Sequence, residues 1–171
     1  VIDRIDECVD EEGNENLAKQ RFLDWPSSPN QPGVEAGCRA LLSWALKDAE
    51  VLCNLLEEQE HAKKCRAISK RLKKQIKQPN GLKQAAALMS IAGLMKPEQA
   101  CSEVISVDGA KDFSTFYGYY MLQALAQAGE YQQALDIIRQ YWGGMLDLGA
   151  TTFWEDFNLD WIHNAARLDD F

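Results

Sequence analysis

The stretch VEAGCRALLSWALKDAEVLCNLL, residues 34–56, decides the fold class of this chain. Its apolar residues recur at intervals of three and four positions, which is the spacing of one face of an α-helix. The members of this stripe are Cys38, Leu41, Leu42, Ala45, Leu46, Ala49, Leu52, Cys53 and Leu56. A loop at residues 25–33 precedes the stripe and holds three prolines and a glycine, which cannot propagate a helix. The pattern predicts a long amphipathic helix that starts near Val34.

The same spacing continues along most of the chain, and strand signals are nearly absent. Further helices are expected at residues 62–76, 82–92, 97–105, 114–128 and 130–142, after the end of another at 1–11. Gly143 and Gly144 are expected to lie beyond the end of the last helix. Helices of this length joined by short turns form antiparallel hairpins, so the predicted fold class is all-α.

Two all-α arrangements fit such hairpins: a solenoid of tetratricopeptide-like repeats, or a toroid of hairpins around a pocket. Residues 128–135, AGEYQQAL, are similar to the turn between tetratricopeptide helices. A solenoid needs self-similar units at a period of about 34 residues, and no second copy of this turn occurs at that distance. The toroid is therefore the favoured arrangement.

Composition limits the kinds of partner. The 171 residues are enough for one domain, and 46% hydrophobic with 26% charged residues is ordinary for a folded domain. A net charge of −8 argues against a nucleic-acid surface, which would need a basic face. The basic residues gather between Lys63 and Lys77, where a solvated helix face is the first interpretation and phosphate or partner binding is the alternative.

No metal, cofactor, disulfide framework or membrane span is expected. The five cysteines are odd in number and lack CxxC spacing, so we expect reduced, buried side chains. His61 and His163 lie far apart, and neither has a second ligand at helical spacing. No apolar run reaches the roughly 18 residues of a membrane span. Because the pattern is already under way at Val1, we expect a piece of a longer protein, and its compartment stays open.

Two segments place a carboxylate beside a tryptophan: Asp24 with Trp25, and Glu155 with Trp154. An aromatic ring covers the apolar face of a sugar while a carboxylate handles hydroxyl groups or protons, so both pairs are candidate sugar-binding residues. Ordinary alternatives exist for each segment. Glu155 would be a first-turn helix residue, Asp24 a turn residue and Trp25 a packing side chain.

The run STFYGYY, residues 114–120, is aromatic around a whole helical turn. Four aromatic side chains cannot all share one core-facing side, so Tyr117 or Tyr120 is a candidate for lining a pocket. Core packing is the alternative for both. Gly118 between them permits a close approach of another backbone or of a ligand.

Residues 141–157, YWGGMLDLGATTFWEDF, resemble a segment of bacterial α-L-rhamnosidases of glycoside hydrolase family 78. Phe22-Leu23-Asp24-Trp25 and the aromatic run at 115–120 resemble two further elements of that family, in the same order, so the likeness spans about residues 15–165. The resemblance implies that residues 1–171 are part of an (α/α)6 toroid, a catalytic barrel that removes terminal α-L-rhamnosides with inversion. Either a cytoplasmic or a periplasmic location in a bacterium is compatible with it.

The resemblance also implies roles for individual residues. Glu155 matches the general base that takes a proton from water, and Trp154 shapes the sugar site beside it. Asp24 and Trp25 match the loop that touches the rhamnose, with the Trp25 ring against the C5 methyl group. An inverting enzyme needs a second carboxylate, about 6.5–9.5 Å from the first, to protonate the leaving oxygen. The arginine- and glutamate-rich segment that carries this acid in the family has no counterpart in these residues.

We therefore expect no hydrolase activity from the chain alone, because proton donation to the leaving group is missing. A toroid cut in half exposes apolar faces, which predicts self-association. Two alternatives stay open. One is a non-catalytic helical scaffold or carbohydrate-binding relative, and the other is a toroid glycosidase that acts on uronic or fucosyl residues.

Overall fold

The computed structural model describes residues 1–163, which form helices joined by turns, with no strand in that range. The α-helices are α1 (Ile2–Asp6), α2 (Gln31–Leu55), α3 (Gln59–Leu72), α4 (Lys83–Ile91), α5 (Pro97–Ala100), α6 (Gly118–Gln127) and α7 (Tyr131–Asp147). A π-helical turn at Cys101–Ile105 directly follows α5, and 3-10 turns lie at Ala18–Gln20, Lys73–Gln75 and Leu159–His163. The all-α prediction is confirmed, whereas the toroid stays a prediction. The last residues of the family-like range, 164–165, lie outside the described residues.

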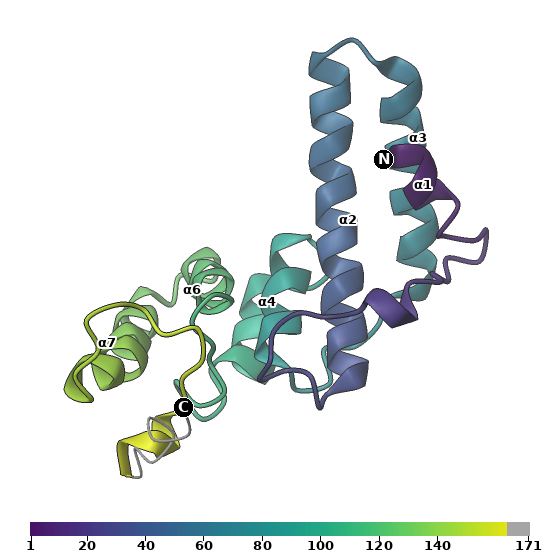
Figure 1. Cartoon of the computed structure of the whole chain (residues 1–171). Coiled ribbons are helices and arrows are strands. Elements are labelled where there is room, and N and C mark those ends of the chain that lie inside the picture. Colours follow the sequence, from purple (N-terminus) through teal and green to yellow (C-terminus); the bar gives the residue numbers. More distant parts are fainter. Residues whose placement is uncertain (164–171) are drawn as a thin grey trace.

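The helices form two groups (Figure 1). α2 and α3 run antiparallel as a long hairpin with α1 against α3, and α4 packs against the N-terminal half of α2. α6 lies against α4, and α7 lies against α6. The loop that carries Asp24 and Trp25 therefore passes close to α4, while the segment with Glu155 follows α7.

The helix α2 begins three residues earlier than predicted. Asn30 caps it, because the Asn30 Oδ1 accepts a hydrogen bond from the Gly33 amide at 3.1 Å. Pro32 falls in the first turn, where its missing N–H has no helical partner to lose. The Asn80 side chain donates to the same Asn30 oxygen at 2.8 Å and so joins the start of α2 to the loop before α4.

The predicted end of α7 is wrong. The helix passes through Gly143 and Gly144 and ends at Asp147. Each glycine costs about 1 kcal/mol in a helix interior, but α7 buries Tyr141, Gly144 and Met145 on one face. Tertiary packing of that face outweighs the local penalty. The start of α6 also differs, because residues 115–117 form a turn and the helix begins at Gly118.

The main core surrounds α4, whose residues 85–88 are fully buried. These are three alanines and a leucine, and small side chains let neighbouring segments approach α4 closely. Gly37 in α2 shows how close this is: a Cβ added there would lie 2.5 Å from Leu23 Cδ1 and 3.5 Å from the Cβ of Ala85. The loop before Asp24 is thus pressed between α2 and α4.

A second, smaller core lies between α1, α2 and α3. Its buried members are Val9, Leu46, Cys65, Ile68 and Leu72. The basic run of the sequence lies outside this core and is engaged in ion pairs. These pairs join Lys63 to Glu60, Lys64 to Asp3, Arg66 to Glu50, Arg71 to Asp6 and Glu11, and Lys77 to Glu35. A solvated, paired helix face describes this run.

All five cysteines are free thiols. The expectation of burial is confirmed for Cys65 and Cys101 and wrong for Cys8, Cys38 and Cys53, which are half-buried. Apolar spacing on a helix does not tell whether a neighbouring segment covers the whole stripe. At Cys53 the stripe has reached the end of the hairpin, where Leu55 and Leu56 are 76% and 64% exposed.

Candidate functional site

A hollow of about 510 Å³ lies between four segments: the Trp25 loop, the start of α4, the loop at residues 110–113, and the segment that follows α7. This volume is within the range of about 300–1,000 Å³ that is usual for small-molecule sites. Aromatic side chains on its wall are Trp25, Phe113, Tyr141, Phe157 and Trp161, and its carboxylates are Asp112 and Asp156. An aromatic wall with a few polar groups suits a ligand that has both apolar and hydroxyl faces.

The carboxylate of Asp24 lies behind the wall of this hollow and contacts it through Gln84. Its Oδ2 accepts hydrogen bonds from Ser114 Oγ at 2.7 Å and from Gln84 Nε2 at 3.1 Å. Its Oδ1 accepts from the Ser27 amide at 3.0 Å, which closes the turn that carries Trp25. Asp24 thus joins three segments that are far apart in the sequence. The turn interpretation of Asp24 is correct, but the residue also ties that turn to α4 and to the loop before α6.

Gln84 is the polar group that these contacts orient. A carboxylate only accepts hydrogen bonds, so the amide nitrogen of Gln84 must face Asp24 and its Oε1 must point elsewhere. Gln84 is 1% exposed and contributes to the wall of the hollow. Its Oε1 is buried and has no hydrogen-bond partner within the described residues. A buried acceptor without a donor costs about 1–3 kcal/mol.

Lys83, beside Gln84, supports the wall of the hollow. Its Nζ donates to the carbonyl oxygens of Val107 and Gly109, each at 2.7 Å, and lies 5.2 Å from the centre of the Phe113 ring. Burial disfavours the charged ammonium and lowers the pKa of Lys83 to about 8. Two of its three donors are used on backbone, so Lys83 mainly holds the loop after the π-helical turn against α4.

Trp25 lies at the rim of the hollow. Its side chain is 66% exposed and makes one edge contact with Phe22, at 5.1 Å between ring centres. A largely open indole next to a hollow is available to a ligand. Of the six residues that the sequence proposed for the site, Trp25 lines this hollow and Asp24 contacts its wall through Gln84.

The second acid–tryptophan pair is placed differently. Glu155 is exposed and does not belong to the wall of the hollow. Trp154 is half-buried and packs against Phe157, at 5.9 Å between ring centres. The neighbouring Asp156 does contribute to the wall. The role of Glu155 as a general base stays a prediction.

Tyr117 and Tyr120 belong to an aromatic cluster away from the wall of the hollow. Tyr117 is 8% exposed, and its ring lies 5.6 Å from that of Tyr120. Tyr120 packs edge-on against Trp44 of α2 at 5.9 Å. Burial first, and the nearby charge of Asp24 second, raise the pKa of Tyr117 to about 12. Tyr117 is therefore a packing residue of the core, and the charge of Asp24 acts on its hydroxyl group.

The sequence pattern did not indicate Gln84, Lys83 or Ser114 as residues of the site. Their signal was weak because Lys83 and Gln84 open a predicted helix, where polar residues are normally solvated. Both are instead more than nine-tenths buried. Ser114 belongs to the aromatic run at residues 114–120, where the aromatic side chains and not the serine gave the candidate residues. The contacts of all three come from segments that are distant in the chain.

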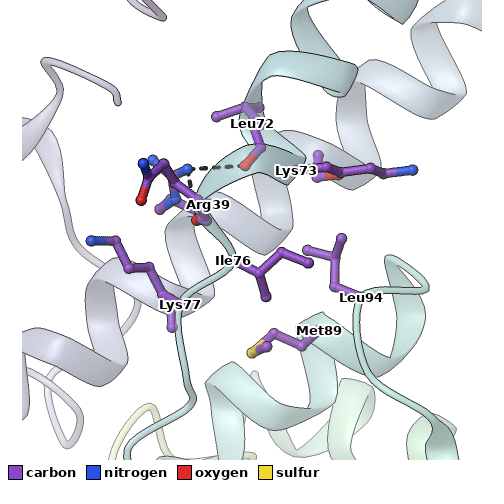
Figure 2. Close-up of a pocket in the computed structure, with 10 residues that line it drawn as sticks. Arg39, Leu72, Lys73, Ile76, Lys77, Met89 and Leu94 are labelled. Carbon is purple, nitrogen blue, oxygen red and sulfur yellow. Dashed lines mark hydrogen bonds between the residues drawn. The ribbon is translucent and has the colours of Figure 1, made fainter. Parts of the chain in front are cut away.

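A second, much smaller hollow lies beside Arg39, whose side chain joins three segments of the backbone (Figure 2). The Arg39 Nη2 donates to the carbonyl oxygens of Gly13, Leu72 and Gln75 at 2.8, 3.1 and 3.0 Å. These contacts hold the end of α3 and the N-terminal loop against α2. The space that remains is about 10 Å³, close to the minimum for one water molecule.

No group of three or more His, Cys, Asp or Glu side chains suited to a metal ion was found in the part of the chain that the structure describes. Over residues 1–163, no helix is both long enough and apolar enough to cross a bilayer. Comparisons with protein-family models, with curated proteins and with solved structures found no match to this chain. The function has to be argued from the residues of the site.

Proposed function

We propose that this chain is the sugar-binding part of a glycoside hydrolase of the α-L-rhamnosidase type, built as a portion of an (α/α)6 toroid. The resemblance of residues 141–157 and 22–25 to that family supports the proposal. The observation that carries the binding function is the Asp24 network. It anchors the turn of Trp25 at the rim of a hollow of ligand size and holds the side chain of Gln84, which contributes to the wall of that hollow.

Each part of this site has a task in sugar binding. The exposed indole of Trp25 covers an apolar face of the sugar, and the C5 methyl group of rhamnose extends that face. Asp24 is a positioning residue, because it fixes the amide of Gln84 and the turn of Trp25.

In catalysis, Glu155 is proposed to take a proton from the attacking water. The general acid would come from outside the segments that match the family. Binding of sugar by this chain without turnover is the expected behaviour, because one of the two carboxylates of an inverting pair is missing. Detectable rhamnoside hydrolysis by these 171 residues would contradict this division of roles.

Binding is tested by titrating the chain with methyl α-L-rhamnoside in a calorimeter. Trp25→Ala is expected to weaken binding roughly tenfold, since the stacked ring is lost. Phe153→Ala is the matched control, because Phe153 is an exposed aromatic residue, 78% accessible, outside the wall of the hollow. Equal effects of the two variants, or no binding by the unmodified chain, would refute the proposed site.

Catalysis is tested with Glu155→Gln in the complete parent enzyme. A lost general base predicts a fall in turnover of several orders of magnitude with binding retained. A near-normal rate would remove Glu155 from the mechanism. A panel of nitrophenyl glycosides with the same enzyme separates rhamnosides from fucosides and uronides.

The exposure of Glu155 favours a second candidate, a non-catalytic carbohydrate-binding helical domain. This candidate uses the same Trp25 and Gln84 contacts but gives Glu155 no role. The two candidates differ in the parent enzyme experiment: the carbohydrate-binding domain predicts no change of turnover with Glu155→Gln. The sequence upstream of Val1 also separates them, because an arginine- and glutamate-rich segment there would favour the hydrolase.

A further inference from the structure

The helix α2 carries apolar side chains on two faces, and within residues 1–163 only one of these faces is covered. Leu42, Leu46 and Ala49 belong to the small core between α1, α2 and α3. A second row of side chains recurs at intervals of four and three positions on another side of the helix. We call this row the outer seam, and its members are Leu41, Ala45, Asp48, Leu52 and Leu55. The apolar stripe of the sequence thus divides into a packed row and an outer row.

The outer seam is open to solvent. All five of its residues are exposed, and Leu52 and Leu55 are 56% and 76% exposed. α2 packs against α3 and α4, but the closed end of the α2–α3 hairpin extends beyond the other helices (Figure 1). Val51 and Leu56 are also exposed at this end and widen the apolar surface. A helix that is apolar on two sides is normally covered on both, and a contiguous exposed apolar surface marks an interaction site.

The spacing of the outer seam indicates the shape of its partner. Steps of four, three, four and three positions form the heptad pattern of a coiled coil, in which side chains of one helix insert between those of another. From Leu41 to Leu55 the seam spans two heptads, about 21 Å along the helix axis. The partner that fits such a seam is an amphipathic α-helix.

A single charged residue interrupts the outer seam at its centre. Asp48 is exposed, and within residues 1–163 its carboxylate has neither an ion pair nor a hydrogen bond. Residues 48–60 hold five acidic residues and no Lys or Arg, so this end of the hairpin is acidic. Glu50, Glu58 and Glu60 pair with side chains of α3, whereas Asp48 does not. A charged residue in a coiled-coil seam selects a partner of opposite charge at the same level.

A second copy of the chain fits the outer seam poorly. Whether two such seams run parallel or antiparallel, their full overlap places the two Asp48 carboxylates at the same level. Like charges that face each other disfavour association, and the net charge of −8 adds to the repulsion. A basic helix meets neither obstacle.

We propose that the outer seam of α2 docks an amphipathic helix of another protein, which has apolar side chains at heptad spacing and a Lys or Arg opposite Asp48. The apolar side chains of the partner insert between Leu41, Leu52 and Leu55. The cation of the partner pairs with the Asp48 carboxylate and fixes the register of the two helices. No residue of the outer seam lines the hollow, so this proposal does not depend on sugar binding.

The experiment measures binding of a fluorescein-labelled synthetic peptide to the whole chain by fluorescence anisotropy. The probe consists of leucine at heptad spacing and lysine elsewhere, and a second probe has glutamate in place of every lysine. We expect the lysine probe to bind, and the glutamate probe to bind roughly tenfold more weakly or less, because its charges repel the acidic end of the hairpin.

Leu55→Ser tests the apolar part of the docking site. It removes a leucine from the centre of the exposed apolar surface, so we expect the lysine probe to bind roughly tenfold more weakly. Leu146→Ser is the matched control, because Leu146 is an equally accessible leucine of α7, 68% exposed, and should leave binding unchanged.

Asp48→Asn tests the charged part of the docking site. It keeps the size of the side chain and removes its charge, so we expect binding of the lysine probe to weaken roughly threefold and to depend less on salt. Lys47→Gln is the matched control, since it changes an exposed charge of opposite sign at the neighbouring position and should not weaken binding.

Four outcomes would overturn the proposal. They are no binding of the lysine probe, equal binding of both probes, equal losses in Leu55→Ser and Leu146→Ser, and a dimer of the chain alone that Leu55→Ser dissociates in sedimentation. The last outcome would assign the outer seam to a second copy. Circular dichroism shows whether Leu55→Ser folds, and Asp48→Asn keeps the proposal falsifiable if it does not.

Discussion

The two acid–tryptophan segments look alike in the sequence and differ in the structure. Asp24 accepts hydrogen bonds from Ser27, Gln84 and Ser114, and its neighbour Trp25 stands open at the rim of the hollow. In the second segment the carboxylate is exposed and the tryptophan is half-buried. The acid is anchored and the indole exposed in the first segment, whereas the acid is exposed and the indole half-buried in the second. The same pair of residue types can anchor a loop or project from it, and distant donors decide which.

The largest expected effect comes from Asp24→Ala. It leaves Ser114 Oγ, Gln84 Nε2 and the Ser27 amide without their acceptor, so we expect a loss of about 2–4 kcal/mol in the free energy of unfolding. Glu155→Ala, at an exposed position, should change it by less than about 0.5 kcal/mol. Urea unfolding measures both. Similar losses in the two variants would show that the segments are equally anchored.

The next effect concerns the helices behind each segment. In Gly37→Ala the new Cβ would lie 2.5 Å from Leu23 Cδ1, under the first loop, and we expect a loss of about 1–3 kcal/mol. Gly143→Ala, in α7 ahead of the second segment, meets no atom within 4 Å and should stabilise by about 0.5–1 kcal/mol. Thermal unfolding gives the sign of each change. A stabilising Gly37→Ala would mean that the first loop is loosely packed.

Ser114→Ala tests one contact of the Asp24 network. It removes the 2.7 Å hydrogen bond and leaves two donors on the carboxylate, so a loss of about 1 kcal/mol is expected. Thr152→Ala is the counterpart in the second segment, where the side chain is exposed and no measurable loss is expected. Chemical denaturation of the double variant Asp24→Ala/Ser114→Ala adds a check. It should be hardly less stable than Asp24→Ala, because the two residues share one interaction.

The two tryptophans are expected to differ in their contribution to stability although the change in side-chain size is the same. Trp25→Ala removes an indole that is 66% exposed, so the free energy of unfolding should change by less than about 0.5 kcal/mol. Trp154→Ala removes a half-buried ring that packs on Phe157 and should cost more than about 1 kcal/mol. Equilibrium unfolding of both variants tests whether Trp154→Ala loses more unfolding free energy than Trp25→Ala. Equal losses would mean that Trp25 packs as part of the core.

Several parts of the fold could be predicted from the sequence because they depend on local patterns. Apolar spacing predicted α2, α3 and α4 within a few residues, since a helix that buries one face must repeat that spacing. The end of α7 was missed because Gly143 and Gly144 are unfavourable in an isolated helix, and burial of Tyr141 and Met145 outweighs this. The start of α6 was placed too early because Ser114 lies in an irregular segment that bonds Asp24, and residues 115–117 form a turn before the helix.

The candidate site was predicted in part. Residue type alone made Asp24 and Trp25 candidates, because an indole covers the apolar face of a sugar while a carboxylate handles hydroxyl groups. Residue type could not separate that pair from Trp154 and Glu155. Gln84 looked like a solvated residue of a first helical turn and is instead buried against the carboxylate of Asp24.

By itself, the sequence determined that this protein is all-α and where its long hairpin lies, and it made an acid and a tryptophan in each of two segments candidates for sugar binding. These properties follow from helical periodicity and from the chemistry of side chains, which act over a few neighbouring residues. Only the tertiary structure decided which acid is anchored and which indole is open. Both depend on hydrogen bonds and packing between segments far apart in the chain, and such contacts have no local signature.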